Sequence, residues 1–187
     1  MAVLVLAVIV AVLPRGKETA APKAAEDLGP GRAKAALAAC PQGTGEVQQL
    51  RGVSVPCLGD GSTSDLGTAL AGHETLVNVW ATWCQPCKTE LPVLNAYAAQ
   101  PGAVSVLAVQ VASLASDGLD LLATLGVHLP AVYDGDGQTG PVRAALKVPP
   151  ALPASYLVSA DGQVRFISNP RLFENTDQVR TAVESVR

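Results

Sequence analysis

This sequence has few aromatic residues and no excess of basic over acidic residues. Phe, Trp and Tyr make up 4% of the 187 residues, and 13 Lys and Arg stand against 16 Asp and Glu, for a net charge of −3. A chain without a basic excess lacks the electrostatic feature on which nucleic-acid binding depends. We therefore expect no nucleic-acid partner. The hydrophobic fraction of 49% is sufficient for a folded core and excludes a disordered chain.

The N-terminal apolar run is too short to span a bilayer unaided. Residues 2–13 cover about 18 Å as a helix, whereas the hydrocarbon core of a membrane is about 30 Å thick. Three interpretations remain open: the apolar region of a signal peptide, the end of a membrane anchor, or a buried core element. Arg15 and Lys17 follow the run, against the usual charge bias for an exported C-terminus. The polar segment that comes next disfavours a buried core element. Of the other two interpretations we favour an anchor over residues 1–14, followed by a flexible linker over residues 15–44.

The chemically most informative stretch is residues 76–92, LVNVWATWCQPCKTELP. Its apolar and β-favouring residues predict a buried strand, and the pattern becomes helical after Cys84. A cysteine at the first turn of a helix faces unpaired backbone N–H groups and the positive end of the helix dipole, which stabilise a thiolate. Cys84 is therefore the expected nucleophile. Cys87 lies one turn further along the same face, where it can bond to Cys84 and resolve a mixed disulfide.

The residues around the two cysteines favour a redox role over a zinc site, in which CxxC pairs also occur. Trp83 directly precedes the first cysteine, and Pro86 suits an early helical position. Together, WCQPCKTELP at residues 83–92 resembles the TlpA/ResA-type extracytoplasmic branch of the thioredoxin-fold dithiol oxidoreductases. The resemblance extends over about residues 45–187, which we take as one domain. It implies a protein dithiol–disulfide oxidoreductase.

Strand and helix patterns alternate after the cysteine pair, which predicts an α/β fold with an at least partly parallel sheet. The resemblance makes this a thioredoxin-like fold: a central mixed sheet flanked by helices, with an N-terminal extension and a central βα insertion. The expected elements are a short helix over residues 32–39, strands over 104–111, 129–134 and 164–167, helices over 113–125, 140–146 and 173–186, and a hairpin turn at 160–163.

The resemblance also assigns residues that would face the cysteine pair. Thioredoxin-like folds place a cis-proline there at the start of the hairpin, and Pro153 is the matching residue. The family pattern has a glycine two residues before this proline and a threonine after it, where this chain has Ala151 and Ala154. The resemblance further implies that substrate contacts Trp83, Gln85, Pro86 and Leu152.

Cys40 and Cys57 form a second pair, separated by seventeen positions and outside any CxxC. In a metal site all four cysteines would have to bind the same ion, and the cysteines of the reactive pair could then no longer exchange disulfides. A structural disulfide is the better interpretation, and such a bond is typical of an oxidising compartment.

Thiol–disulfide exchange also needs a route by which the resolving thiol loses its proton. Asn78 stands where thioredoxins have a buried carboxylate, and an amide cannot accept that proton. In ResA-like proteins a glutamate three residues after the second cysteine is assigned this role, and Glu90 occupies that place. The alternative is that Glu90 is a helix-surface carboxylate paired with a lysine.

We therefore expect a bacterial enzyme tethered to the cell membrane, with its catalytic domain extracytoplasmic. It needs no metal and no cofactor beyond the Cys84–Cys87 disulfide. The resemblance implies cysteine-containing exported proteins, apocytochromes among them, as substrates, and a membrane thiol reductase as electron donor. A peroxiredoxin-like peroxidase is one alternative, but it requires a hydroxyl residue where the chain has Ala81. A metallochaperone is another, with His128 as the one histidine available downstream; we otherwise interpret His128 as a loop residue without a partner.

Overall fold

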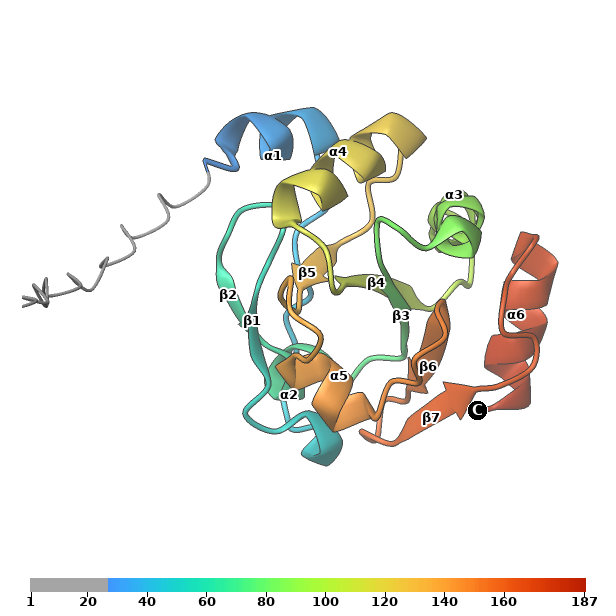
Figure 1. Ribbon diagram of the computed structural model, residues 1–187. Coiled ribbons are helices and arrows are strands. Elements are labelled where there is room, and N and C mark those ends of the chain that lie inside the picture. Colours follow the sequence, from blue (N-terminus) through green and yellow to red (C-terminus); the bar gives the residue numbers. More distant parts are fainter. Residues whose placement is uncertain (1–26) are drawn as a thin grey trace, which may run out of the picture.

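A five-stranded mixed sheet forms the centre of the fold (Figure 1). The computed structural model of the protein describes residues 27–187. The strand order is β5–β4–β3–β6–β7, with β3 parallel to β4 and antiparallel to β6. All six residues of β3 are buried, because strands flank it on both sides and helices cover the sheet. The strands are β3 Thr75–Trp80, β4 Ser105–Gln110, β5 Ala131–Tyr133, β6 Ala154–Val158 and β7 Val164–Ile167.

Helices cover both faces of this sheet. In Figure 1, α3, α4 and α6 lie on one side of it, and α2, α5 and a small hairpin of β1 and β2 lie toward the other. Helix α3 packs against α6 and α4, while α5 packs against the 3₁₀ turn η1. The bounds are α1 Gly29–Ala35, η1 Gln48–Leu50, β1 Ser54–Pro56, β2 Thr63–Asp65, α2 Leu66–Ala69, α3 Gln85–Ala98, α4 Ala115–Leu125, α5 Pro141–Leu146 and α6 Thr176–Ser185.

Local chemistry sets where the helices begin. The side chain of Asp65 accepts a hydrogen bond from the N–H of Thr68 at the start of α2, and Asn175 does the same for Gln178 in α6. At α3 the capping atom is the sulfur of Cys84. Each of these side chains satisfies an N–H that the helix itself leaves unpaired.

The predicted alternation of strands and helices is confirmed, and most bounds agree within three residues. The strand and helix expected as an insertion are β4 and α4, and β4 pairs along its whole length with β3. Strand β2 and turn η1 were not expected, because segments of three residues carry no measurable hydrophobic period.

Within the expected linker of residues 15–44, α1 and Cys40 are packed on the domain, which corrects the interpretation of that part as flexible; residues 15–26 lie outside the described residues. The helix expected over residues 32–39 is observed as α1, Gly29–Ala35, and it packs against α4. Ala35 is fully buried, and the N–H of Ala38 donates to the carbonyl of His128 at 2.8 Å. Small apolar residues allow this close packing. The expected anchor over residues 1–14 lies outside the described residues.

No helix within residues 27–187 is both long and apolar enough to cross a membrane.

The predicted bond between Cys40 and Cys57 is present, and it joins the N-terminal extension to the β1–β2 hairpin. Both cysteines lie against β5, the edge strand of the sheet. Cys57 forms a β-bridge with Val132, and the N–H of Leu58 donates to the carbonyl of Ala131 at 2.8 Å. The cross-linked segments therefore cover a sheet edge that would otherwise expose unpaired backbone groups.

The double variant Cys40→Ala/Cys57→Ala should lose about 3 kcal/mol of unfolding free energy, because the bond closes a loop of 17 residues. Urea denaturation under non-reducing conditions measures this loss. The matched control is Cys84→Ala/Cys87→Ala, whose loop spans a sequence separation of only 3 and should cost about half as much. An equal or larger loss in the control would contradict this account of the Cys40–Cys57 bond.

Candidate active site

Cys84 and Cys87 lie where β3 passes into α3, and they are joined in a disulfide with their Cα atoms 5.3 Å apart. The Sγ of Cys84 accepts a hydrogen bond from the N–H of Cys87 at 3.2 Å. After reduction, the same N–H and the helix dipole stabilise a thiolate on Cys84. Cys84 is 4% exposed whereas Cys87 is fully buried. The sulfur of Cys84 is therefore the more accessible of the two, and that of Cys87 is shielded from solvent.

Pro153 lies beside this junction, as the resemblance implied. The β3–β6 register pairs Val79 with Ala154, so Pro153 stands next to the end of β3 that leads into the cysteines. The Leu152–Pro153 peptide bond is cis, and Pro153 is buried. Arg171 holds the loop before β6, donating from Nη2 to the carbonyls of Ala151 at 2.6 Å and Pro153 at 3.3 Å.

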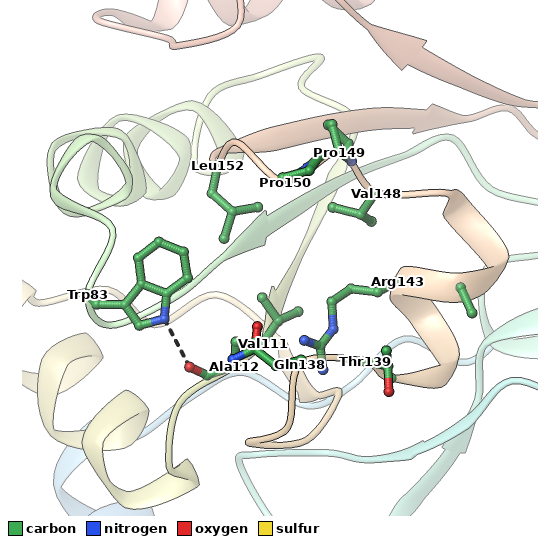
Figure 2. A pocket seen from close by; sticks show the side chains of 12 residues that line it. Trp83, Val111, Ala112, Gln138, Thr139, Arg143, Val148, Pro149, Pro150 and Leu152 are labelled. Atoms are coloured by element: carbon green, nitrogen blue, oxygen red, sulfur yellow. Dashed lines mark hydrogen bonds between the residues drawn. The ribbon is translucent and has the colours of Figure 1, made fainter.

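An open cavity of about 470 Å³ is lined by Trp83, the residue before Cys84, and by Leu152, the residue before Pro153 (Figure 2). Trp83 is 59% exposed, and its indole Nε1 donates to the carbonyl of Ala112 at 2.9 Å. Gln85 and Pro86 are exposed at the start of α3 but do not line the cavity. The structure thus brings together two of the four expected substrate contacts.

Apolar side chains and one ion pair form the rest of this cavity. Val111, Val148 and Pro149 line it, and Arg143 approaches from α5 (Figure 2). Sequence reasoning missed these residues because they come from segments that are distant along the chain.

A buried ion pair between Asp134 and Arg143 holds this part of the cavity wall. The side chain of Asp134 has no exposed surface, and it accepts hydrogen bonds from the N–H of Val142 at 2.7 Å and from Nε of Arg143 at 2.8 Å. Arg143 also donates to the carbonyl of Gly137. A side chain at Gly140 would come within 2.2 Å of the Asp134 carbonyl oxygen, so glycine is required there. An aspartate directly after a strand and an arginine nine residues later was the available sequence signal.

Glu90 is fully buried, which excludes the alternative of a surface carboxylate paired with a lysine. One carboxylate oxygen accepts from Nδ2 of Asn78 at 2.7 Å, and the other accepts from the N–H of Phe173 at 2.9 Å. Burial raises the pKa of Glu90 to about 7, and the two hydrogen bonds oppose this shift without cancelling it. A carboxyl with this pKa takes up and releases a proton near neutral pH.

His128 has a partner, contrary to the expectation of a free loop residue. Its Nδ1 lies 2.9 Å from the carbonyl oxygen of Ala35, so the ring contacts the C-terminal end of α1. In the described part of the chain, no group of three or more His, Cys, Asp and Glu side chains is placed to hold a metal ion.

A cysteine pair at a strand-to-helix junction, with a cis-proline beside it on a mixed sheet, defines a thioredoxin-fold dithiol protein. Solved structures support the fold. A secreted Mycobacterium tuberculosis disulfide oxidoreductase homologous to E. coli DsbE is 25% identical, with a TM-score of 0.62 over 74% of this chain and 98% of that chain. MTB dsbF is also 25% identical, with a TM-score of 0.61 over 74% of this chain and 97% of that chain. The predicted thioredoxin-like fold is confirmed.

The chain belongs to the Redoxin family, whose model matches residues 38–182. It is 34% identical over 99 residues to the thiol:disulfide interchange protein CycY of Rhizobium leguminosarum bv. viciae, covering 52% of this chain and 50% of CycY. It is 35% identical over 97 residues to the thiol-disulfide oxidoreductase ResA of Bacillus subtilis, covering 51% of this chain and 52% of ResA. The chain spans about half the length of the curated relatives that it matches. The resemblance to the TlpA/ResA-type branch is confirmed.

The unfolding free energy should fall as pH rises from about 4.5 to about 7. Over this range the folded protein keeps a proton on Glu90 that the unfolded chain has released, so rising pH favours unfolding. Over this pH range the parent should lose roughly 3 kcal/mol more unfolding free energy than Glu90→Gln, because the glutamine has no proton to release. Urea denaturation of both oxidised proteins across this pH range measures the difference. A constant difference between parent and variant would show that Glu90 has an ordinary pKa.

Proposed function

We propose that this protein is an extracytoplasmic thiol–disulfide oxidoreductase that exchanges disulfides with protein substrates through Cys84 and Cys87. The observation that carries this proposal is the position of the pair. Cys84 caps α3 with its sulfur and is the more accessible of the two, while Cys87 is fully buried. Trp83, the residue before Cys84, lines an open cavity, and the chain's relatives are named as thiol:disulfide interchange proteins and oxidoreductases.

The exchange proceeds in two displacements on sulfur. The Cys84 thiolate attacks one sulfur of a substrate disulfide, forming a mixed disulfide and releasing the other substrate sulfur as a thiolate. Cys87 then gives its proton to the Glu90 carboxylate, and its thiolate attacks the Sγ of Cys84. The mixed disulfide breaks, the second substrate sulfur leaves as a thiolate, and the Cys84–Cys87 disulfide forms. Two electrons pass to the substrate, and the reverse sequence oxidises a substrate dithiol.

Glu90 acts as the proton acceptor for Cys87 in this scheme. It lies three residues after Cys87 on α3, so the two side chains are neighbours on one face of the helix. Its pKa near 7 keeps a substantial fraction of the carboxyl ionised and ready to accept the proton.

Substrate docking is assigned to the surface around the two sulfurs. Trp83 offers a large exposed apolar face, and Leu152 lines the same cavity (Figure 2). Pro153 shapes the loop that faces the cysteines, and Gln85 and Pro86 lie exposed beside Cys84. An extended segment of a protein substrate would place its cysteine over Cys84 between these groups.

The proposed location is the outer side of a bacterial cell membrane. The Cys40–Cys57 disulfide is typical of an oxidising compartment, and one structural relative is described as secreted. We assign membrane attachment to residues 1–14. The proposed substrates are cysteine-containing exported proteins, including apocytochromes, and a membrane thiol reductase supplies electrons. The exchange itself needs no cofactor beyond the dithiol.

Cys84→Ser should reduce the rate of insulin disulfide reduction at least about 1,000-fold, because the attacking sulfur is lost. Cys87→Ser should instead accumulate a mixed disulfide with the substrate, visible as a mass increase on non-reducing gels. The control is Cys40→Ala/Cys57→Ala, which should retain exchange. Full activity in Cys84→Ser would overturn the proposal. Stoichiometric metal in the reduced parent without insulin reduction would favour a metallochaperone.

Trp83→Ala should raise the KM for a protein substrate about 10-fold, because the variant removes an exposed aromatic contact beside Cys84. The turnover number should change less than about two-fold. Glutathione disulfide is too small to reach across the cavity, so its rate of reduction serves as the control and should remain unchanged. An equal loss with both substrates would assign Trp83 to the environment of the cysteines rather than to docking.

A further inference from the structure

The side-chain amide of Asn78 lies between two oxygen atoms in the core of the protein. Its Nδ2 donates to Oε2 of Glu90 at 2.7 Å and to Oγ of Ser155 at 3.0 Å. All three residues are buried, Asn78 and Glu90 completely. The Oδ1 of the same amide is buried without a hydrogen-bond partner among the described residues. A buried amide that leaves its acceptor unpaired is unusual, because such groups are normally satisfied.

This arrangement suits Glu90 only while Glu90 is ionised. The carboxylate has two hydrogen-bond partners in the described structure, Nδ2 of Asn78 and the N–H of Phe173, and both are donors. Once Glu90 takes up a proton, the carboxyl becomes a donor as well and needs an acceptor. A hydroxyl pointed at Nδ2 would place one donor against another. The protonated state would then bury an unsatisfied O–H.

We propose that the Asn78 amide turns by half a rotation when Glu90 becomes protonated, so that Oδ1 replaces Nδ2 between Glu90 and Ser155. In this orientation Oδ1 accepts from the Glu90 carboxyl and from the Ser155 hydroxyl. Ser155 changes from acceptor to donor, as a rotating hydroxyl allows. Asn78 and Ser155 are therefore positioning residues for the proton transfer to Glu90. This role of the rotation rests on the proposed exchange reaction.

The protonation state of Glu90 decides which orientation is favoured. With Glu90 ionised, the present orientation makes a charge-assisted hydrogen bond and leaves only Oδ1 unpaired. After the turn, Nδ2 occupies that unpaired position, which is unfavourable by itself. Two new hydrogen bonds to Oδ1 compensate once the carboxyl carries a proton. Asn78 thus serves both forms of Glu90 through a side-chain rotation, without any movement of β3.

The surroundings of Glu90 leave few other groups that could drive the turn. Neighbouring β3 and β6 contribute the uncharged Asn78 and Ser155, and the segment before α6 contributes the N–H of Phe173. The titratable neighbour on α3 is Cys87, and it holds no proton in the disulfide form. Tyr156 on β6 titrates far above neutral pH, since burial raises its pKa to about 12.

The test is nuclear magnetic resonance on the oxidised protein at pH 5.5 and pH 8.5. At pH 8.5 the Nδ2 protons of Asn78 should show a nuclear Overhauser contact with the Hβ protons of Ser155. At pH 5.5 this contact should weaken several-fold, with the midpoint matching the titration of the Glu90 carboxyl carbon. The matched control is Glu90→Gln, in which the Asn78 signals should be independent of pH across the same range.

Three results would overturn the proposal. The first is a contact between Asn78 and Ser155 that stays unchanged at pH 5.5 although Glu90 titrates. The second is a pH dependence of the Asn78 signals that remains in Glu90→Gln. The third is the absence of any titration of Glu90 between the two pH values. Failure of the proposed function is distinguishable from these results. If the parent protein shows the expected change at Asn78 but does not reduce insulin, the rotation of the amide is supported and its role in disulfide exchange is not.

Discussion

The passage from β3 into α3 is the constraint on which the rest of the structure depends. Strand β3 is buried throughout and bonded to a neighbour on each side, so its end is fixed in space. The chain must then begin a helix at once, and the first N–H groups of that helix need acceptors. Cys84 supplies one with its sulfur. The same contact that starts the helix therefore places a reactive sulfur at the positive end of the helix dipole.

Burial of a carboxyl under this junction is the second feature of the site. A carboxylate in the core is unfavourable unless it is hydrogen-bonded, and Glu90 has donors from β3 and from the segment before α6. These contacts join three parts of the chain around one titratable group. The result is a pKa near neutrality at a position one helical turn from Cys87. The Glu90 side chain thus both joins these segments by hydrogen bonds and carries a titratable group near the cysteines.

The cavity beside Trp83 is formed by segments that are more distant along the chain. Trp83 follows β3, Leu152 precedes β6, and Arg143 belongs to α5, which the buried Asp134 holds in place. At the far edge of the sheet, the Cys40–Cys57 bond fastens the N-terminal extension over β5. Both arrangements hold irregular segments against a rigid sheet. Variation in those segments can change the cavity without altering the cysteine pair.

The sequence by itself determined the alternating strands and helices, the position of Cys84 and Cys87 at a helix start, and the pairing of Cys40 with Cys57. These features follow from local hydrophobic period, from capping chemistry and from the small number of cysteines. Only the tertiary structure decided that Glu90 is buried, that Asn78 and Ser155 enclose it, and that Arg143 borders the cavity. Each of these depends on which distant segments become neighbours, and a side chain carries no local mark of the partners that a sheet register will bring to it.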